Sequence, residues 1–456
     1  MAYFSEFTYL AASILFIFGL KALSHPDTAR RGMNLAAFGM LLAIIGTLVR
    51  HEILRYDWII AGLVIGSAIG AAMSIWMPMT AMPERTALSH SFGALAASLV
   101  GISEYYRHGA ELGAFKMTAI GFEVMFGGIT VTGSIMAFAK LSELVRGSPI
   151  TYKGQNILNV SLFVVTAVIF ITLIFLPGSS ALFYTMVGLS FLFGILLVLP
   201  IGAADMPVVM SLMNSYAGLA SAATGFALSN NVLIIAGTLD GFSGFILSIL
   251  MCKAMNRSIN NVLFGAFGAE ASGTATQTEG VMREVSTEDV AVQMAYARQV
   301  VFVPGYGMAT AQAQHVVREL AELLEARGVT VKYAIHPVAG RMPGHMNVLL
   351  AEANVPYSSL YELEQINSEF PTTDVAIVIG ANDVVNPDAR DNPQSPIAGM
   401  PILEVDRAHS VVVLKRGRGK GFSGLENPLF FKPNTGMLYG DAKSSLSSLT
   451  HAVQQA

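Results

Sequence analysis

The second half of this 456-residue chain contains the segment Gln299-Val-Val-Phe-Val-Pro-Gly305-Tyr306-Gly307-Met308-Ala309-Thr310. It has the composition of a short apolar strand, a Gly-x-Gly turn and the start of a helix, the order in which dinucleotide-binding folds begin. Further strand-like runs lie at 329–335, 375–379, 402–405 and 411–414, and helical stretches alternate with most of them. Near-continuous Val/Ile runs favour a parallel sheet that helices cover on both faces. We therefore predict a Rossmann-like α/β domain over residues 286–456.

The first half of the chain has a different character. The whole sequence is 53% hydrophobic and only 13% charged, whereas ordinary soluble domains are about 25% charged. Before residue 260, roughly nine apolar stretches are each long enough to cross a bilayer as a helix. They centre near Phe16, Leu42, Ile65, Leu95, Ile129, Val165, Ser190, Gly218 and Gly244. We predict a polytopic helical membrane domain over residues 1–260, followed by a Gly/Ala/Thr-rich linker over 261–285.

The basic residues predict the orientation of this domain. An odd number of spans places the two termini on opposite sides of the membrane. With the C-terminal half inside, roughly nine Lys/Arg fall in inner loops and roughly four in outer loops, in agreement with the positive-inside rule. We expect a multi-pass protein of the cell (inner) membrane, with its soluble domain on the cytoplasmic side. The apolar segment 7–23 lacks a basic start and a cleavage site, so we interpret it as a span and not a signal peptide.

Polar side chains inside the predicted spans are the candidates for transport. His90 lies in the fourth span, Asn214 in the eighth, and Asp205 at the cytoplasmic edge of the eighth, while Glu123 and Asp240 lie in the fifth and ninth. An ionisable group at bilayer depth is costly, so each needs a partner or a wet cavity. Histidine titrates near neutrality, as a proton relay requires. A static packing role for His90 and a helix–helix contact for Asn214 are the alternatives.

Two features of the second half favour NADP(H) over NAD(H). NAD-selective sites usually place an acid at the end of the second strand to bind the ribose 2′-hydroxyl, but here that strand runs into His336-Pro-Val-Ala-Gly-Arg341. The basic pair Lys415-Arg416 instead follows the strand at 411–414, and an arginine can hold a 2′-phosphate with two hydrogen bonds. The alternative for this pair is a solvated strand end. Thr310 replaces the third glycine of the usual fingerprint, so helix and strand are expected to pack differently here.

A second glycine-rich run, Gly380-Ala-Asn-Asp383, follows another buried strand. Ligands bind at the carboxyl ends of parallel strands, which makes Asn382 and Asp383 site candidates. The loop 417–424 has the composition of a flexible flap. We find no metal-ligand cluster, Walker A lysine motif or Ser/His/Asp arrangement in the sequence. The single cysteine, Cys252, allows no intrachain disulfide, and the mildly acidic C-terminal half argues against nucleic acid as a partner.

Long runs of sequence now point to a family. Over essentially its whole length, the chain resembles the β subunit of the proton-translocating NAD(P) transhydrogenase. The resemblance rests on the stretches 202–218, 251–258, 304–309, 336–350 and 380–383. It implies that the soluble half binds NADP(H) and that the membrane half forms a proton channel with helices of an α-type partner. That partner would carry the NAD(H) domain, and the expected assembly is a dimer of the α/β unit in a lipid bilayer.

The resemblance also assigns residues. The implied proton pathway contains His90 and Asn214, and we add Asp205 because it lies at the cytoplasmic edge of the same span. Acid–base catalysis at the nicotinamides is not needed, because the cofactors carry the chemistry. The cofactor contacts expected from the Gly-x-Gly turn and from the family motifs are Gly305, Tyr306, Gly307, Val338, Ala339, Gly340, Arg341, Met342, Pro343, Gly380, Ala381, Asn382, Asp383, Val384, Gly399, Met400, Lys415, Arg416, Gly417, Gly421, Phe422, Asp441 and Ala442.

Two positions depart from the family pattern. Gly417 stands where a serine usually follows the basic pair, which removes one hydrogen bond to a 2′-phosphate. Asp240 stands where a neutral residue is expected. The rival function is a channel or transporter whose cytoplasmic domain senses NADP(H) without turnover. Composition and topology allow it equally, but the length of the matching motifs argues against it.

Overall fold

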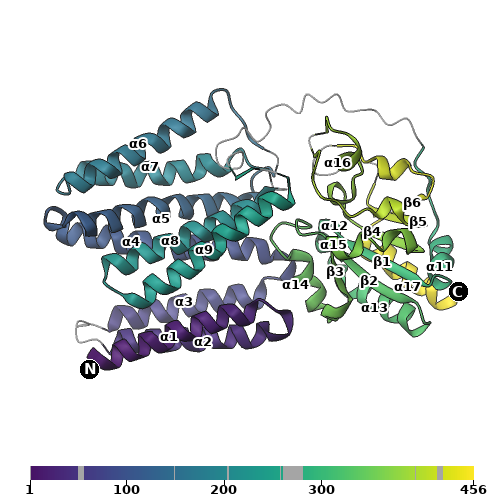
Figure 1. Cartoon of the computed structure of the whole chain (residues 1–456), viewed down its shortest axis with the longest axis horizontal. Helices are drawn as coiled ribbons and strands as arrows, with labels where there is room; N and C mark the ends of the chain where they lie inside the picture. Colours follow the sequence, from purple (N-terminus) through teal and green to yellow (C-terminus); the bar gives the residue numbers. More distant parts are fainter. Residues whose placement is uncertain are drawn as a thin grey trace.

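The computed structural model describes residues 2–49, 56–147, 149–202, 205–256, 258–259, 281–395, 397–417 and 425–456. It has two parts, a bundle of long helices and an α/β domain beside one end of that bundle (Figure 1). The N-terminus lies at the end of the bundle far from the α/β domain, and the C-terminus lies in the α/β domain. This arrangement agrees with the predicted order of a helical domain followed by a Rossmann-like domain.

Nine long helices make up the described part of the membrane half. Eight have the length and hydropathy of a membrane span, which agrees with the prediction of about nine spans. The other, α8, is less apolar and lies among α4, α5 and α9, which cover most of its surface. The helices are α1 (Ala2–Leu23), α2 (Pro26–Leu48), α3 (Asp57–Trp76), α4 (Met82–His108), α5 (Ala114–Leu141), α6 (Gln155–Phe175), α7 (Ser180–Val198), α8 (Met206–Ala227) and α9 (Asn231–Ala254).

Glycines set the closest helix contact in the bundle, between α8 and α9. A Cβ atom on Gly218 of α8 would lie 2.3 Å from the backbone nitrogen of Gly241 on α9. A Cβ on Gly237 would lie 2.4 Å from the backbone nitrogen of Ala222. Lipid gives helices no hydrophobic reason to associate, so backbone contact of this kind is what holds them together.

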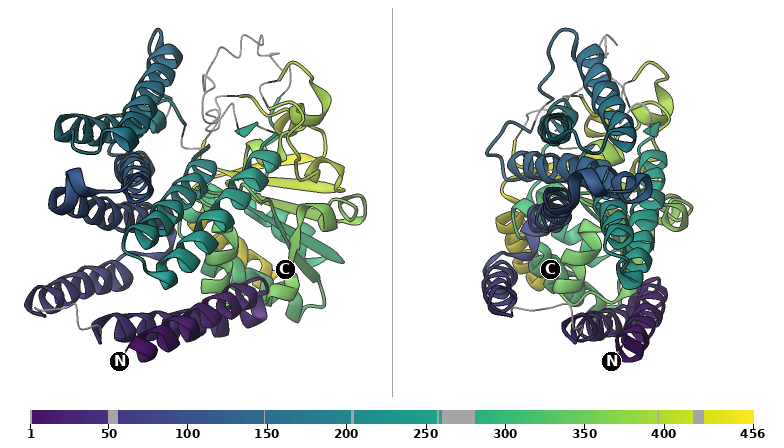
Figure 2. Two further views of the ribbon diagram at one scale, coloured as in Figure 1. Left: turned by 60° about the vertical axis from the view of Figure 1, so that its left-hand side comes forward. Right: turned by 90° about the vertical axis from the view of Figure 1, so that its left-hand side faces the viewer.

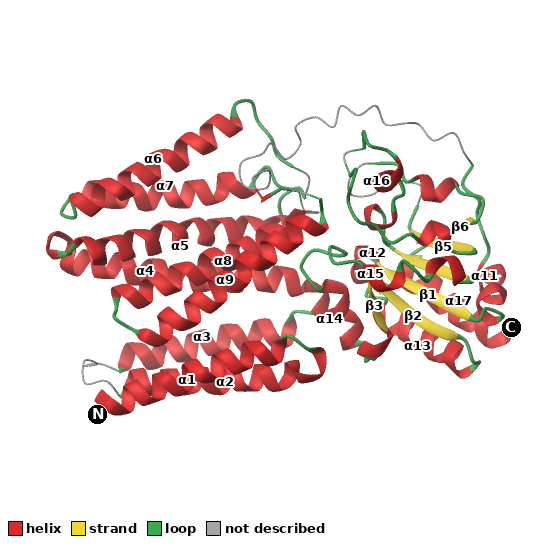
Figure 3. Cartoon of the chain, in the orientation of Figure 1, coloured by secondary structure: helices red, strands yellow, loops and turns green. Residues whose placement is uncertain are grey.

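The α/β domain contains a six-stranded parallel sheet in the order β3-β2-β1-β4-β5-β6. This is the strand order of dinucleotide-binding Rossmann folds. Strands and helices alternate along the chain (Figure 3). The strands are β1 (Gln299–Pro304), β2 (Thr330–Ile335), β3 (Leu360–Glu362), β4 (Val375–Ile379), β5 (Ser410–Lys415) and β6 (Thr435–Tyr439). The α-helices are α11 (Thr287–Ala295), α12 (Tyr306–Thr310), α13 (Gln314–Ala326), α14 (His345–Glu352), α15 (Leu363–Ile366), α16 (Asp388–Asp391) and α17 (Ala442–Gln455).

Both faces of the sheet are buried, as the continuous apolar runs predicted. On β1, Val300 and Phe302 belong to the core on one face, while Val301 and Val303 belong to the core on the other. The first core is covered by α11, α13, α14 and α17. α11 begins just after Ser286, whose hydroxyl accepts a hydrogen bond from the backbone N–H of Asp289.

The strand predicted at 402–405 is wrong. This segment joins no sheet: the Leu403 N–H donates to the Val384 carbonyl in the loop after β4, and Val405 already begins the short 3-10 helix η7. Two other strands were not predicted. β3 is only three residues long, and β6 reads Thr-Gly-Met-Leu-Tyr, which lacks a Val/Ile run. Its glycine is needed because a Cβ on Gly436 would lie 2.6 Å from the Val285 side chain, whose segment pairs with β6.

Candidate functional site

The sheet order reverses between β1 and β4, and the turns that follow these two strands touch. The N–H of Gly305 donates to the Ile379 carbonyl, and the N–H of Gly307 donates to the Gly380 carbonyl, each at 2.9 Å. A Cβ on Gly307 would lie 2.6 Å from the Gly380 Cα. Gly380 also has a φ of +64°, which a residue with a side chain rarely adopts. The Gly-x-Gly turn is therefore required for backbone packing at the crevice where Rossmann folds bind their ligands.

This turn differs from the standard phosphate-binding fingerprint. Two of its N–H groups are used by the neighbouring loop, so they do not point outward at a ligand. The helix that follows, α12, ends at Thr310 after five residues, and α13 begins at Gln314. The Thr310 side chain is exposed and its hydroxyl donates to the Gly307 carbonyl at 3.1 Å. The departure predicted at the third glycine position is thus a real change in how helix and turn are built.

The loop after β2 begins with a buried, neutral histidine. His336 Nδ1 accepts a hydrogen bond from the Val338 N–H at 3.2 Å, so Nε2 carries the proton and donates to the Pro401 carbonyl at 2.7 Å. Burial lowers the pKa of His336 to about 4, although the Pro401 carbonyl favours the protonated form. This residue fixes the start of the loop against the segment before η7 (Val405–Arg407).

Arg341, in the same loop, joins the two halves of the molecule. Its Nη1 donates to the Leu141 carbonyl at the end of α5, and its Nη2 lies 3.1 Å from Glu143 Oε1. Its guanidinium carbon lies 4.0 Å from the centre of the Tyr306 ring. Burial raises the pKa of Tyr306 to about 12, and the charges of Arg341 and Arg416 oppose that rise. A predicted cofactor residue is therefore also a contact with the membrane half.

Other predicted cofactor residues face the membrane half as well. Val338 packs against the buried cluster of that half formed by α5, α7, α8 and α9. Asn256, just beyond α9, donates to the Ala398 carbonyl at 2.7 Å, and a Cβ on Gly399 would lie 2.4 Å from its Nδ2. Met79 packs against the core of the α/β domain. Figure 2 shows the helical bundle and the α/β domain from two further directions.

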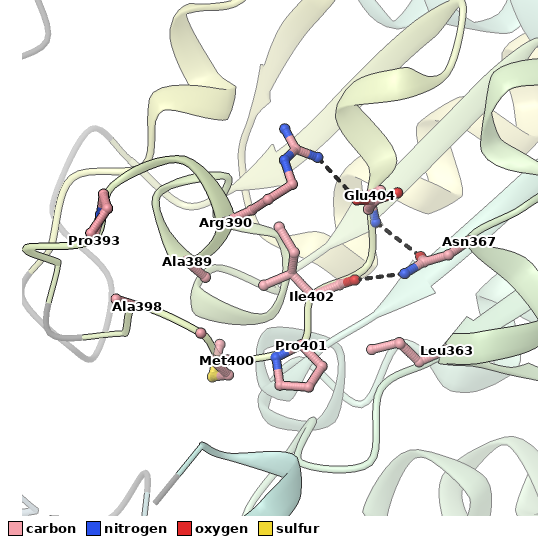
Figure 4. A pocket seen from close by; sticks show the side chains of 11 residues that line it. Leu363, Asn367, Ala389, Arg390, Pro393, Ala398, Met400, Pro401, Ile402 and Glu404 are labelled. Carbon is pink, nitrogen blue, oxygen red and sulfur yellow. Dashed lines mark hydrogen bonds and ion pairs between the residues drawn. The ribbon is translucent and has the colours of Figure 1, made fainter.

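A cleft of about 590 Å³ opens beside Gly399 and Met400 (Figure 4). Arg390 lines it and forms ion pairs with Asp391 in the same helix, α16, and with Glu404 and Asp406. The pairs with Glu404 and Asp406 are structural because they join α16 to η7. Of the predicted cofactor residues, this cleft contains Gly399 and Met400. The lining residues are Leu363, Asn367, Ala389, Arg390, Pro393, Ala398, Gly399, Met400, Pro401, Ile402 and Glu404.

The remaining predicted cofactor residues follow the ends of β4, β5 and β6. Lys415 is the last residue of β5, and its Nζ lies 4.7 Å from the Phe430 ring centre, where burial lowers its pKa. Arg416 is exposed at the same edge, followed by the half-buried Gly417. Asp441 caps α17 by accepting from the Ser444 N–H at 3.1 Å. Gly421 and Phe422 lie outside the described residues. The backbones of Asn382, Asp383 and Val384 form the turn after β4. Ala442, the first residue of α17, is buried.

An asparagine that the sequence did not single out holds the β4 turn in place. Asn427 is buried, and its Nδ2 donates to the Asn382 carbonyl at 3.0 Å. Its own Oδ1 accepts from the Leu429 N–H. An Asn-Pro pair usually indicates a local turn, so this longer-range role had no sequence signal. The same holds for Glu143 and Asn256, which take left-handed φ values of 61° and 50° just beyond helix ends.

In the membrane half, His90 and Asn214 come together on neighbouring helices. Each is the eighth residue after the first residue of its helix, so both lie about 12 Å from the helix start. The Asn214 side chain is a polar neighbour of His90 and also donates to Asp240 on α9 at 3.3 Å. Asp205 does not join this group. It precedes α8 by one residue, about 13 Å along the helix axis from Asn214.

Comparison with known proteins decides the family. The model of the family described as "NAD(P) transhydrogenase beta subunit" matches residues 5–452. The chain belongs to this family. Two relatives from Rhodospirillum rubrum, one of them from a named strain, are both called "NAD(P) transhydrogenase subunit beta". Each is 48% identical over 455 residues, covering 98% of this chain and 98% of the relative.

Membership confirms the predicted family and function. The chain is a β subunit of the proton-translocating NAD(P) transhydrogenase, an oxidoreductase that couples hydride transfer between NAD(H) and NADP(H) to proton movement. It is a membrane protein and works with an α-type subunit, as the name of the β subunit implies. Its family uses nicotinamide nucleotides, so the rival sensor without turnover is not supported.

Proposed function

We propose that the α/β domain binds NADP(H) at the carboxyl edge of its sheet and that NAD(H) binds to the α-type partner. The observation that carries this proposal is a pair of cations, Arg341 and Arg416, near Tyr306. Arg341 stacks on the Tyr306 ring, and Arg416 lies close enough to act on its phenol electrostatically. Since these residues follow β2, β5 and β1, the charge is concentrated where dinucleotides bind in this fold.

The residues present fit a phosphorylated nucleotide. The end of β2 carries no acid, and a 2′-phosphate requires cations. Arg416 is exposed and therefore available, while the partly buried Lys415 adds positive charge behind it. Gly305, Gly307 and Gly380 hold the floor of the crevice so close that no side chain fills it. When bound, the nicotinamide exchanges hydride with a second nicotinamide. The chain contributes binding, orientation and exclusion of water.

We infer that protons cross the membrane half by way of His90 and Asn214, with Asp205 at the entrance. His90 is half-buried and its Nδ1 has no hydrogen-bond partner in the described part of the chain. A histidine in that position can accept a proton from one side and release it to the other. The next residue, Ser91, donates to the Val131 carbonyl of α5 at 3.1 Å, so a shift of α4 acts directly on α5.

Coupling to the cofactor domain would follow from α5. Its last residue, Leu141, and Glu143 just beyond hold Arg341. The neighbouring Lys140 is buried and donates to the Ile201 carbonyl beyond α7 at 2.7 Å, which fixes this end of α5. A change in α4 or α5 on protonation would alter the position of Arg341 and, with it, the affinity for NADP(H). Linkage makes the coupling reciprocal, so the cofactor also changes proton affinity.

The proton gradient has a suitable size for this task. Hydride exchange between two nicotinamides is nearly isoenergetic. One proton moving through 100 mV supplies about 2.3 kcal/mol, which shifts the product ratio roughly 50-fold.

We further propose that the α/β domain lies on the cytoplasmic side of the cell (inner) membrane. The basic residues of the inner loops support this orientation. The working unit would be a dimer in which each half contains the α-type partner and this β subunit.

The decisive experiment uses the full chain with its α-type partner in vesicles. Reduction of an NAD analogue by NADPH should require both subunits and should be accompanied by proton movement. Calorimetry on the full chain alone should find NADPH binding and no comparable NADH binding. Equal affinity for the two nucleotides would contradict the cofactor assignment, and NADPH binding without turnover would favour a sensor.

A further inference from the structure

Asp240 is an ionisable residue of the membrane half that the function proposed above does not use. It is the tenth residue of α9, far from either helix end. Its Oδ1 accepts the 3.3 Å hydrogen bond from Asn214 Nδ2. The helices approach closely here because Gly244 has no side chain: a Cβ at that position would lie 2.8 Å from Asn214 Nδ2. The backbone contact of α8 and α9 therefore brings the carboxylate and the amide together.

The position of Asp240 on the chain points to a polar environment. Its side chain is exposed on the surface of this chain, while His90 and Asn214 are half-buried. A carboxylate facing lipid at this depth would be costly. The side chain must therefore face water or another protein segment in the assembled membrane complex. Through Asn214 it adjoins the polar group that contains His90.

Three titratable groups on other helices of the bundle have contacts of their own. Tyr9 of α1 shares a hydrogen bond with Thr47. Glu123 of α5 is buried beside Gly101 and Thr224. Tyr216 of α8 packs edge-on against an α5 phenylalanine, with ring centres 5.1 Å apart. Within the described ranges, the side chain that donates a hydrogen bond to the Asp240 carboxylate is Asn214.

The hydrogen-bonding capacities of these groups define their roles. An ionised carboxylate only accepts hydrogen bonds, so the Asn214 end that faces Asp240 must be the NH₂ group. The amide oxygen is then left for the other neighbour, His90. An amide oxygen accepts an N–H, and a protonated imidazole has an N–H on both nitrogens. With a neutral side chain at position 240, the Asn214 amide is free to turn its NH₂ group toward His90. An NH₂ group facing the ring opposes protonation of the His90 imidazole.

We propose that Asp240 is a positioning residue for the proton pathway, because its carboxylate fixes the Asn214 amide so that the amide oxygen accepts an N–H from His90. This inference rests on the proposed roles of His90 and Asn214. In the step itself, His90 gains a proton on one ring nitrogen from one side and loses a proton to the other side. Asp240 stays ionised and Asn214 keeps its amide protons throughout.

The test compares Asp240→Asn with the parent chain, both with the α-type partner in vesicles. Asparagine has the same shape but can face Asn214 in either orientation. We expect unchanged NADPH binding, and a pH optimum of proton-coupled hydride transfer about one unit lower, on the scale of a lost charged neighbour. Asp240→Glu should restore the optimum. Ser243→Ala, which removes a hydroxyl one turn along α9, should leave it unchanged.

Further variants separate the possible outcomes. Asn214→Ala should move the optimum by itself, and adding Asp240→Asn should then have no further effect, because both changes remove one interaction. A parental pH profile in both Asp240→Asn and Asp240→Val would overturn the inference, as would fully additive effects with Asn214→Ala. His90→Asn is measured in parallel. If the His90→Asn variant still pumps protons, the proposed pathway is wrong. If this variant does not pump while the Asp240 variants keep the parental pH profile, only the role of Asp240 is wrong.

Discussion

Arg341 is the residue whose replacement should most clearly separate the two halves of the molecule. Its side chain is 8% exposed and takes part in one hydrogen bond to a backbone carbonyl, one ion pair and one stacking contact. Methionine has a similar length and keeps the apolar packing, so Arg341→Met removes the charge and the donors. We expect the loop 336–344 to detach from the end of α5.

The magnitude follows from the three contacts. A hydrogen bond from a charged group contributes about 1.5–3 kcal/mol, and a guanidinium stacked on the partly buried Tyr306 ring adds about 0.5–1 kcal/mol. The ion pair adds little, because Glu143 is 75% exposed and such pairs are worth about 0–1 kcal/mol. We therefore expect a loss of about 2–4 kcal/mol in loop closure. This corresponds to roughly 30-fold to 1000-fold faster opening of the loop.

Amide hydrogen exchange of the full chain in bilayer discs measures this opening directly. Exchange in 336–344 should rise by the factor given above in Arg341→Met, while exchange in β1 and β4 should not change. Glu143→Gln is the matched control on the other side of the contact, and it should speed exchange less than about 5-fold. The reasoning fails if exchange in 336–344 is unaltered in Arg341→Met, or if Glu143→Gln has an equally large effect.

Three further outcomes are expected. Arg416→Ala should weaken NADPH binding by about 1.5–3 kcal/mol in calorimetry and leave NADH binding almost unchanged; equal losses would contradict the 2′-phosphate role. His90→Asn should fold and bind NADPH but lose proton-linked hydride transfer in both directions, measured in vesicles, and near-normal pumping would refute the relay. His336 stays neutral in the folded chain down to about pH 4, whereas the unfolded chain binds its proton near pH 6.5. Stability should therefore fall by up to about 3 kcal/mol between pH 6.5 and 4, and His336→Gln should flatten this dependence in thermal unfolding.

The sequence predicted the architecture where pattern and chemistry agree. Continuous Val/Ile runs on β1, β4 and β5 identified strands buried on both faces, and apolar length identified the spans. Prediction failed at 402–405, where apolar residues bond a loop instead of a strand, and at β6, where a glycine replaces the usual β-branched residues. Strand pairing depends on which neighbour is available, and local composition does not contain that information.

Some features of the candidate site could likewise be predicted from the sequence and others could not. The glycines after β1 and β4 could be recognised because close backbone approach permits only glycine. Their contact with each other depends on the strand order, and the use of their N–H groups by the neighbouring loop had no sequence signal. The pairing of Asn214 with Asp240 was equally hidden, because it depends on the register of α8 against α9. The sequence marked each residue as costly in a membrane, but not its partner.

Arg341 is both a predicted cofactor residue and a contact with the end of α5. This sets a limit on the free energy by which the membrane half and the α/β domain can be coupled. A ligand can shift an equilibrium only by its difference in affinity between two states. If Arg341 binds a cofactor phosphate in one state and the end of α5 in the other, its docking energy of about 2–4 kcal/mol is the free energy available for coupling. That is close to the 2.3 kcal/mol per proton at about 100 mV. A much stronger contact would lock the domain, and a much weaker one would let hydride transfer run without the proton. The exposed Glu143 keeps the ion pair weak, so Arg341→Lys, which keeps the charge but loses the fork, should reduce protons moved per hydride while leaving turnover measurable. An unchanged ratio in Arg341→Lys vesicles would show that coupling takes another route.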